Sequence, residues 1–510
     1  MSNYSSGKRI AKNTLALYFR QILVMIVSLY TIRVVLEVLG MEDYGIYNVV
    51  AGIITMFSFL SGAMATATQR YFSFNIGNKA VEKLKKTFSI SLLIYLLIAI
   101  IVVFFSETIG LWFVYKKLHI PENRIFAAHW IYQVSIISFV FSILATPFMA
   151  LIIAHEDMTI YAYISIFEVL LKLGIVFILP LIHGDKLIIY SILITCVVFL
   201  YTTTYKIICR IKYNECEYKI IYDKELFVEL LNYTGWNIFG ASVGVVKNQA
   251  INILLNQSFN PIVIAARSIS FQVNSAVSSF SQNFSTAVRP QIIKLYATNK
   301  YEKMNSLINN SCKSTFSLMY VITLPLIIEM ATVLKLWLKT PPVYSVIFCR
   351  LVLIEALIDS ISYPIQTAIQ ATGKIKLYQS SVGGVLLLNL PMAYIALTLS
   401  ANPTSVYMIS IFLTIVACVV RFILLARLIN FSTINFIQKV VYPLLLSSSV
   451  SIILSAPLYL VEIKSNILFL ARIVLVILIS MISFLTFSTT LVEKQRIIQE
   501  IIKIGTNSRN

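Results

Sequence analysis

Runs of about 20 apolar residues recur from near the start of this 510-residue chain to near its end. A helix of this length spans the roughly 30 Å hydrocarbon core of a bilayer. We count about 14 such runs, at 13–36, 45–69, 87–113, 127–154, 160–182, 187–208, 226–256, 261–288, 314–337, 344–371, 377–399, 405–428, 441–461 and 467–490. The sequence therefore predicts an all-α integral membrane protein with about 14 transmembrane helices.

Composition supports this prediction. The chain is 58% hydrophobic and 12% charged, whereas soluble proteins carry about 25% charged residues. The first apolar run follows a basic segment but is longer than a signal peptide allows and lacks a small-residue cleavage site, so we expect it to remain as the first helix. The six cysteines form no CxxC pair and have no histidine partner at metal spacing, so we expect no metal site.

Lysine and arginine alternate in abundance between successive loops, which predicts orientation by the positive-inside rule. One set of segments is rich in them, including Arg9, Lys12, Lys83, Lys85, Lys86, Lys206, Arg210, Lys212, Lys300 and Lys303. The opposite set holds few, among them Lys116, Arg124, Lys186 and Lys339. With an even number of spans, both termini are predicted to be cytoplasmic. The net charge of +19 is dispersed through short loops, which favours anionic lipid headgroups rather than nucleic acid as its partner.

The chain repeats itself after 217 to 220 positions. Residues 146–163 and 363–380 align without a gap, and share Pro147 with Pro364, Ile152 with Ile369, Ala154 with Ala371 and Tyr161 with Tyr378. One face of the second span carries small or polar residues, namely Asn48, Gly52, Thr55, Gly62 and Thr66. Each has a polar counterpart in the eighth span 220 positions later, and in the same order these are Ser268, Gln272, Ser275, Gln282 and Thr286. We interpret this as a six-helix unit copied once.

Because six is even, both copies enter the membrane from the same side and the repeat is parallel. We therefore predict an N-terminal six-helix bundle at 1–225, a C-terminal six-helix bundle at 226–430, and an additional helix pair with a cytoplasmic tail at 431–510. Two such bundles facing each other would enclose a cleft suited to alternating access.

Ionisable residues inside apolar spans are expensive and should face a cavity or a partner. This chain has Arg20 beside Gln21, Lys172, Lys247, Arg267 and Arg350. One interpretation is a cationic cavity for an anionic group. Structural alternatives stay open: Lys172 follows Glu168 by four residues, as Glu37 follows Arg33, and Arg267 and Arg350 lie close enough to a membrane face to snorkel.

Two further features of the sequence indicate which ligands or ions the protein could bind. The spans at 226–256 and 261–288 are rich in Asn, Gln and Ser, which would suit a water-filled wall that binds hydroxyl-rich sugars. Glu355 and Asp359 lie one helical turn apart. They are either a proton- or sodium-coupling site or counter-ions to the cavity cations.

No enzyme motif is present. The four histidines show no HExxH spacing, and the chain has no GxxxxGK[ST] phosphate loop and no GxSxG elbow. We therefore expect neither catalysis nor an organic cofactor.

The segment VLEVLGMEDYGIYNVVAGI at 35–53, the basic N-terminus leading into the first span, TQRYFS at the end of the second, and the twelve-plus-two plan resemble bacterial polysaccharide flippases of the Wzx type. These belong to the multidrug/oligosaccharidyl-lipid/polysaccharide (MOP) flippase superfamily. The resemblance covers roughly the whole chain, and LGxxxYGIY is its most specific motif.

The resemblance implies a bacterial inner-membrane carrier that flips a polyprenyl-diphosphate-linked O-antigen or capsule oligosaccharide to the periplasmic leaflet. Arg20, Lys247 and Arg267 would meet the diphosphate, and the polar stripes that include Asn48, Thr55, Gln272 and Ser275 would line the path. Other polysaccharide-assembly proteins are possible partners. Alternatives are a lipid II flippase, a cation-coupled multidrug extruder of the same superfamily, a membrane-embedded polysaccharide polymerase or ligase, and a scaffold without transport.

Overall fold

The chain is helical throughout the part that the computed structural model describes, which is residues 2–118, 120–216, 223–259, 261–400, 402–429, 431–459 and 465–488. The predicted cytoplasmic tail at 489–510 lies outside it. The first half contains α1 (Ser2–Thr55), α2 (Ser58–Gly77), α3 (Val81–Phe105), α4 (Leu111–Lys117), α5 (Ile125–Ala154), α6 (Met158–Ile178), α7 (Lys186–Lys212) and α8 (Lys224–Ser258). The second half contains α9 (Pro261–Ala297), α10 (Tyr301–Leu338), α11 (Ser345–Ala371), α12 (Ile375–Leu387), α13 (Asn389–Ser400), α14 (Thr404–Ile429), α15 (Thr433–Phe436), α16 (Tyr442–Tyr459) and α17 (Asn466–Phe487).

Among the described residues, twelve helical segments are long and apolar enough to cross a membrane. The sequence predicted about 14. The two that differ are α9 and α11, which are as long as the others but carry more polar and charged side chains. Their polarity has a structural reason, because both helices line the cavity described below.

Gly40 separates the first two spans. The helix α1 continues through both of them but is kinked at this residue, which has φ 80° and ψ 169°. Only glycine adopts this backbone conformation readily, because a Cβ atom would clash with the main chain. The glycine of the LGxxxYGIY motif therefore forms the turn between two membrane spans.

Helix boundaries confirm the internal repeat. The helices α2 and α9 end 220 positions apart, at Gly77 and Ala297, and α5 and α11 end 217 positions apart, at Ala154 and Ala371. Positive φ angles recur at the same points, at Glu156 (67°) and Gly373 (80°). The repeat therefore preserves turns as well as helices.

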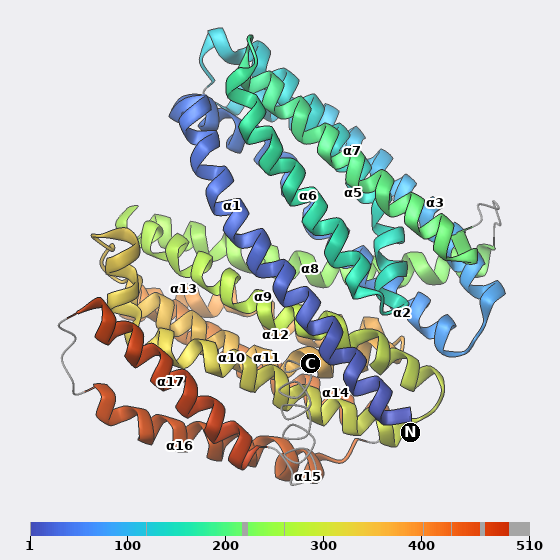
Figure 1. The fold of residues 1–510 in the computed structure, drawn as a ribbon, viewed down its shortest axis with the longest axis vertical. Coiled ribbons are helices and arrows are strands. Elements are labelled where there is room, and N and C mark those ends of the chain that lie inside the picture. Colours follow the sequence, from blue (N-terminus) through green and yellow to red (C-terminus); the bar gives the residue numbers. More distant parts are fainter. Residues whose placement is uncertain are drawn as a thin grey trace, which may run out of the picture. The chain divides into compact units, whose positions relative to one another are not determined.

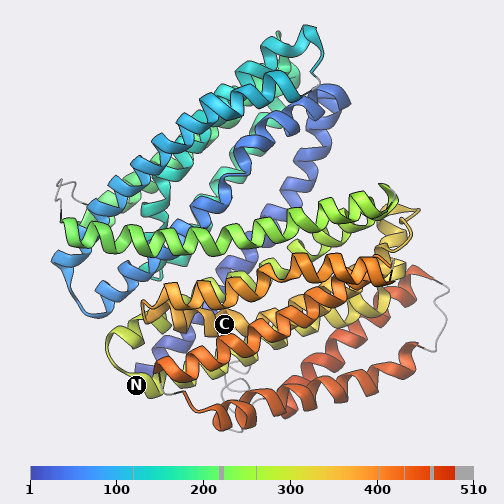
Figure 2. The same ribbon diagram turned by 180° about the vertical axis from the view of Figure 1, so that it is seen from behind.

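The chain divides into two compact units. The first is the chain up to Ser242 with Thr286–Asn299 and Gly373–Gln379, and the second is Val243–Ser285, Lys300–Thr372 and the chain from Ser380 onward. In the first unit α5 packs against α7, α2 and α3, and α1 packs against α6 and α5 (Figure 1). In the second unit α11 lies between α10 and α14, and α17 packs against both α10 and α16 (Figure 2).

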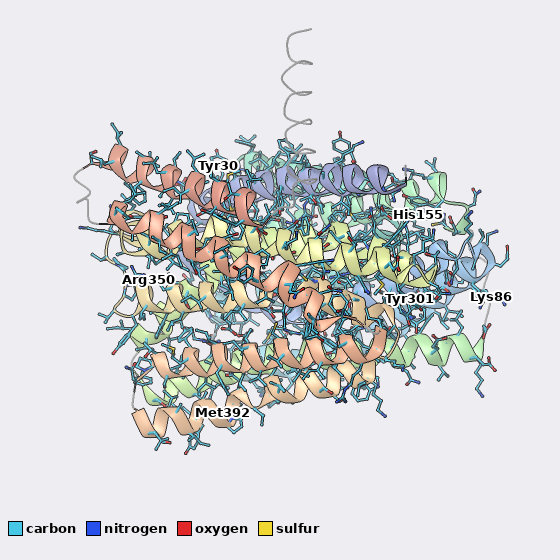
Figure 3. All side chains as sticks on the ribbon, turned by 90° about the horizontal axis from the view of Figure 1, so that it is seen from below. Tyr30, Lys86, His155, Tyr301, Arg350 and Met392 are labelled. Carbon is cyan, nitrogen blue, oxygen red and sulfur yellow. The ribbon has the colours of Figure 1, made fainter. Side chains whose placement is uncertain are left out.

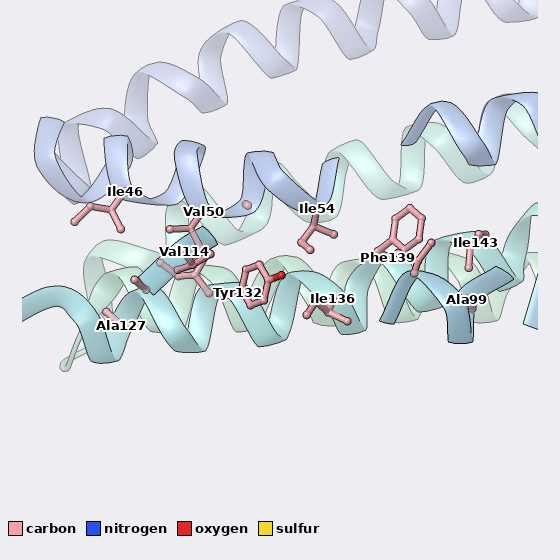
Figure 4. Packing of buried hydrophobic residues seen from close by; sticks show 14 of the residues in the cluster. Ile46, Val50, Ile54, Ala99, Val114, Ala127, Tyr132, Ile136, Phe139 and Ile143 are labelled. Carbon is pink, nitrogen blue, oxygen red and sulfur yellow. The ribbon is translucent and has the colours of Figure 1, made fainter. Parts of the chain in front are cut away.

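Apolar side chains hold the first unit together. One cluster joins the second span to α3, α4 and α5 through residues such as Val50, Ile131 and Ile143, all fully buried (Figure 4). Tyr132 packs within it, and its hydroxyl donates to the Ser106 carbonyl at 2.6 Å, where a π-helical turn joins α3 to α4. A buried hydroxyl needs such a partner.

Polar contacts connect helix ends of the first unit beyond the apolar cluster. At one end Arg124 donates to Asp43 at 2.6 Å and to Asp185 at 2.9 Å, so one guanidinium joins three helix starts. Lys86 and His155 both lie at the opposite end, on the right in Figure 3, which is the end predicted to be cytoplasmic.

Candidate functional site

The second unit contains a polar cavity of about 380 Å³. It lies among α8, α9, α11 and α14, and we call it the second-unit cavity. Five charged side chains line it: Lys247, Arg267, Glu355, Asp359 and Arg421. Three cations face two carboxylates, which leaves an excess of one positive charge.

Lys247 and Glu355 form an ion pair inside this cavity. Lys247 Nζ on α8 lies 3.0 Å from Glu355 Oε1 on α11, and the side chains are 14% and 22% exposed. The same carboxylate oxygen accepts from the Thr414 hydroxyl of α14 at 3.0 Å. The sequence offered no local acidic partner for Lys247, because this one lies 108 residues away.

Asp359, one turn further along α11, has a different partner. Its Oδ1 accepts from Arg421 Nη1 of α14 at 2.9 Å. Each member of the predicted acidic pair is thus a counter-ion to a cavity cation, which was one of the two interpretations left open. A role in ion coupling stays a prediction.

Arg267 differs from the other cations because its contacts in the described part of the chain are to amides and an aromatic ring rather than to a carboxylate. Its Nε donates to the Asn252 side chain, and its Nη2 donates to the Asn248 carbonyl at 3.3 Å. The guanidinium carbon lies 5.9 Å from the centre of the Tyr407 ring. Only 9% of Arg267 is exposed. This buried cation is the source of the excess charge.

Uncharged polar groups complete the wall, namely Asn248, Ser270, Asn274, Ser275, Ser278, Gln282 and Ser410. Ser275 and Gln282, which belong to the predicted polar face of α9, both line this cavity. Gln272, predicted with them, is exposed and does not line this cavity. The cavity faces one side of α9, and Gln272 lies outside that side.

A second pocket, of about 400 Å³, lies between α1 and α6 in the first unit. Arg20, Lys172 and Glu168 line it. Lys172 Nζ lies 2.6 Å from Glu168 Oε1, as their spacing of four residues predicted. Arg20 stacks over Tyr161 at 4.9 Å from the ring centre and donates to Gln21 at 3.3 Å. This pocket also holds one more cation than it has carboxylates.

Other predicted side chains make local contacts. Asn48 donates to the Tyr44 carbonyl at 2.8 Å and Thr55 to the Gly52 carbonyl at 2.9 Å, so both bond their own helix. Neither lines the two pockets above. Arg350 does not line the cavity and donates instead to the carbonyls of Ile327 and Ile328 on α10.

The sequence analysis did not single out four charged side chains that make buried contacts in the structure. Arg421 is a lone arginine within an apolar span, which was the available signal. Arg472 of α17 and Glu329 of α10 form an ion pair of 2.5 Å within the second unit. Each side chain was visible as a charge in an apolar run, but the partners lie far apart in the sequence.

The fourth charged side chain is Glu156, in the turn between α5 and α6. Its side chain is fully buried, and it accepts from Arg9 at 2.7 Å, from Lys294 at 2.7 Å and from Gln291 at 3.0 Å. Its carbonyl accepts from Asn13 at 2.9 Å. One carboxylate therefore joins α1, this turn and the last turns of α9, all within the first unit.

Comparison with known proteins identifies the fold. The MatE family model matches residues 16–178. An outward-facing multidrug resistance MATE family transporter of the MOP superfamily superposes with a TM-score of 0.73 at 12% identity, covering 82% of this chain and 96% of that one. MATE in a bent conformation gives 0.69 at 14%, covering 83% and 96%, and the MATE transporter ClbM in complex with Rb+ gives 0.65 at 17%, covering 84% and 96%. A comparison with curated protein sequences finds no match.

At these identities the similarity establishes the fold alone, which is the fold of MATE transporters. The chain is therefore an all-α, multi-pass membrane protein with this fold. The finer resemblance to polysaccharide flippases, the glycan and the bacterial inner membrane stay predictions.

Proposed function

We propose that this protein is a bacterial inner-membrane carrier that flips an anionic, lipid-linked oligosaccharide across the bilayer by alternating access. The observation that carries this proposal is the positive excess in the second-unit cavity, where buried Arg267 is held by amides and a tyrosine ring. A guanidinium in this setting can exchange its neutral partners for phosphate oxygens.

The cavity lining favours a sugar beside the phosphate. Hydroxyl and amide groups of α8 and α9 provide both donors and acceptors, which match the hydroxyls of a glycan. A diphosphate with a sugar cannot cross hydrocarbon alone, because burying unpaired polar groups costs several kcal/mol each. The cavity would replace their water while the lipid tail remains in the bilayer.

A second candidate is cation-coupled export of organic molecules. The observation that favours it is the pair Glu355 and Asp359 in the same cavity, together with the multidrug transporters among the structural relatives. Ion pairing of both carboxylates with cavity cations speaks for the anionic substrate, because a cationic drug or coupling ion would have to displace Lys247 or Arg421.

Proteoliposomes test the two candidates. The purified protein is reconstituted with a fluorescent polyprenyl-diphosphate-linked disaccharide, and transfer between leaflets is read by quenching from outside. We expect Lys247→Met and Arg267→Gln to slow the transfer at least tenfold. The matched control is Arg33→Gln, since Arg33 is an exposed cation outside both pockets.

The same vesicles with imposed sodium or proton gradients test export of a cationic dye. Dye export that depends on a gradient and fails in Glu355→Gln, without transfer of the lipid-linked sugar, would overturn the proposal in favour of the second candidate. Sugar transfer that is equal in Lys247→Met, Arg267→Gln and Arg33→Gln would remove the cationic-cavity argument.

A further inference from the structure

The second unit has another cavity, at the end predicted to be cytoplasmic. Its volume is about 810 Å³. Three elements form it, namely the first turns of α10, the segment from Phe431 to Pro443, and the end of α17. We call it the amide pocket, since Asn305, Asn309, Asn310, Asn435 and Gln438 line it.

The α10 wall of the amide pocket is one helical face. Glu302, Ser306 and Lys313 line the pocket together with Asn305, Asn309 and Asn310, and their spacing of three or four residues places them on one side of a helix. The opposite wall is a π-helical turn, Ile437–Val441, which presents Gln438 and Lys439. Turns of this kind occur often at functional sites.

Two amide oxygens in the pocket could accept hydrogen bonds from a ligand. Asn305 Oδ1 and Asn309 Oδ1 are buried and accept no hydrogen bond from the described residues. An unsatisfied buried acceptor costs about 1–3 kcal/mol, so a ligand that brings hydroxyl groups would gain by binding there.

Two lysines in the lining indicate that the ligand should also carry negative charge. Lys313 is only 9% exposed, and its Nζ donates to the Ser488 carbonyl at 3.1 Å. Lys439 is exposed at the rim. Among the described residues that line the pocket Glu302 is the single carboxylate, so this part of the lining carries a net positive charge that suits a phosphate or an acidic sugar.

The polar groups of the amide pocket are not inherited from the repeat. The positions 220 residues before Asn305, Asn309 and Lys313 are Lys85, Ser89 and Leu93. The first copy therefore has no amide at the first two positions and leucine where the second copy buries a lysine. The pocket is also completed by α15, α16 and α17, which follow the second copy.

The segment that forms one wall of the amide pocket also carries exposed apolar side chains. Ile434, Ile437, Tyr442 and Leu445 are 50% to 70% exposed and come from the same segment that forms its wall. The same segment therefore presents polar groups to the pocket and exposes apolar side chains outside the pocket lining. This arrangement fits a lipid whose headgroup is in the pocket and whose chains lie in the bilayer.

We infer that the amide pocket binds a polyhydroxylated anionic headgroup attached to a lipid. The same chemistry is found in two sources, the glycerol phosphate of phosphatidylglycerol and the sugar diphosphate of a polyprenyl-linked glycan. The inference does not depend on transport, because it concerns binding to a pocket within the second unit.

Native mass spectrometry of the full-length protein in detergent tests the inference. Protein is titrated with dioleoylphosphatidylglycerol, with a polyprenyl-diphosphate-linked N-acetylhexosamine, and with dioleoylphosphatidylcholine as the lipid without headgroup hydroxyls or net charge. The first variant is Asn305→Leu with Asn309→Leu. Replacing an unsatisfied buried polar group by an apolar one of similar shape is nearly neutral for folding, so this variant should keep its melting temperature.

The second variant is Lys439→Met, and the matched control is Lys83→Met, an exposed lysine of α3 in the first unit. We expect both pocket variants to weaken binding of at least one anionic lipid about tenfold, as loss of one or two hydrogen bonds to a charged group would do. Phosphatidylcholine binding and Lys83→Met should show no change.

The two anionic lipids then identify the source. Weakened phosphatidylglycerol binding alone assigns the pocket to a bulk lipid, and weakened binding of the lipid-linked sugar assigns it to the glycan carrier. If neither anionic lipid changes by more than twofold in the pocket variants, or if Lys83→Met has the same effect, the inference is refuted.

Discussion

Replacing Glu156 by glutamine removes one negative charge from the contact that joins α1, the α5–α6 turn and the end of α9. The side chain keeps its shape and its hydrogen bond to Gln291, so the change isolates the charge. Lys294, whose side chain is 20% exposed, then has no carboxylate at 2.7 Å. Arg9 loses the same partner but is 53% exposed, so water replaces it.

The exposed fractions of Lys294 and Arg9 determine how much each lost ion pair should lower the free energy of unfolding. Breaking a buried ion pair by removing one partner costs about 3–5 kcal/mol, whereas an exposed pair contributes about 0–1 kcal/mol. Since Lys294 is mostly but not fully buried, we expect Glu156→Gln to lower the free energy of unfolding by about 3 kcal/mol. Arg9→Gln should lower it by about 1 kcal/mol or less.

Intrinsic tryptophan fluorescence during heating measures this effect in detergent. Three of the four tryptophans, Trp112, Trp130 and Trp236, lie in the first unit, so the signal reports mainly on the part that contains Glu156. The expected fall in the apparent melting temperature is roughly 6 °C for Glu156→Gln.

A double variant sharpens the experiment. Glu156→Gln with Lys294→Gln removes both charges and should recover much of the loss, because no unpaired buried charge remains. A melting temperature of Glu156→Gln within about 1 °C of the native protein, or equal effects of Glu156→Gln and Arg9→Gln, would refute the argument from burial.

Three further predictions concern other sites. Lys247→Glu should abolish transport in the vesicle assay. The double variant Lys247→Glu with Glu355→Lys should restore part of the transport, because it re-forms the ion pair, which measures 3.0 Å in the native protein, with the charges exchanged. If the double variant does not recover transport, the lysine itself contacts the substrate. Gly373→Ala should lower the free energy of unfolding by about 2 kcal/mol, measured by thermal unfolding, since φ is +80° and the new methyl would lie 2.9 Å from an arginine nitrogen. The His155 imidazole, with Nε2 at 3.6 Å, lowers the pKa of the Glu215 carboxyl below its usual 4.5. The pair therefore stabilises the protein above about pH 4.5 and loses this effect as the pH falls below it, so the melting temperature of Glu215→Gln should approach that of the native protein in acid.

Local patterns in the sequence determined the membrane helices, the repeat and some contacts. Apolar runs of about 20 residues are predicted to be helices, because a helix satisfies all its backbone groups within its own segment in hydrocarbon. The pair of Glu168 and Lys172 was predictable because four residues make about one helical turn. The polar face of α9 likewise predicted Ser275 as a cavity residue, because periodicity fixes which residues share a face.

Helical periodicity does not show which other helices or cavities a polar face contacts. The tertiary structure determines those contacts. Asn48 and Thr55 share a polar face that is predicted to line the transport path; in the structure each donates to a carbonyl of its own helix, and their place on the path stays a prediction. Glu355 was ambiguous until helix packing placed it against Lys247 of another helix. Glu156 gave no local signal at all, since its partners lie on α1 and α9. Ion pairs between helices depend on which helices become neighbours, and that depends on the packing of the whole chain.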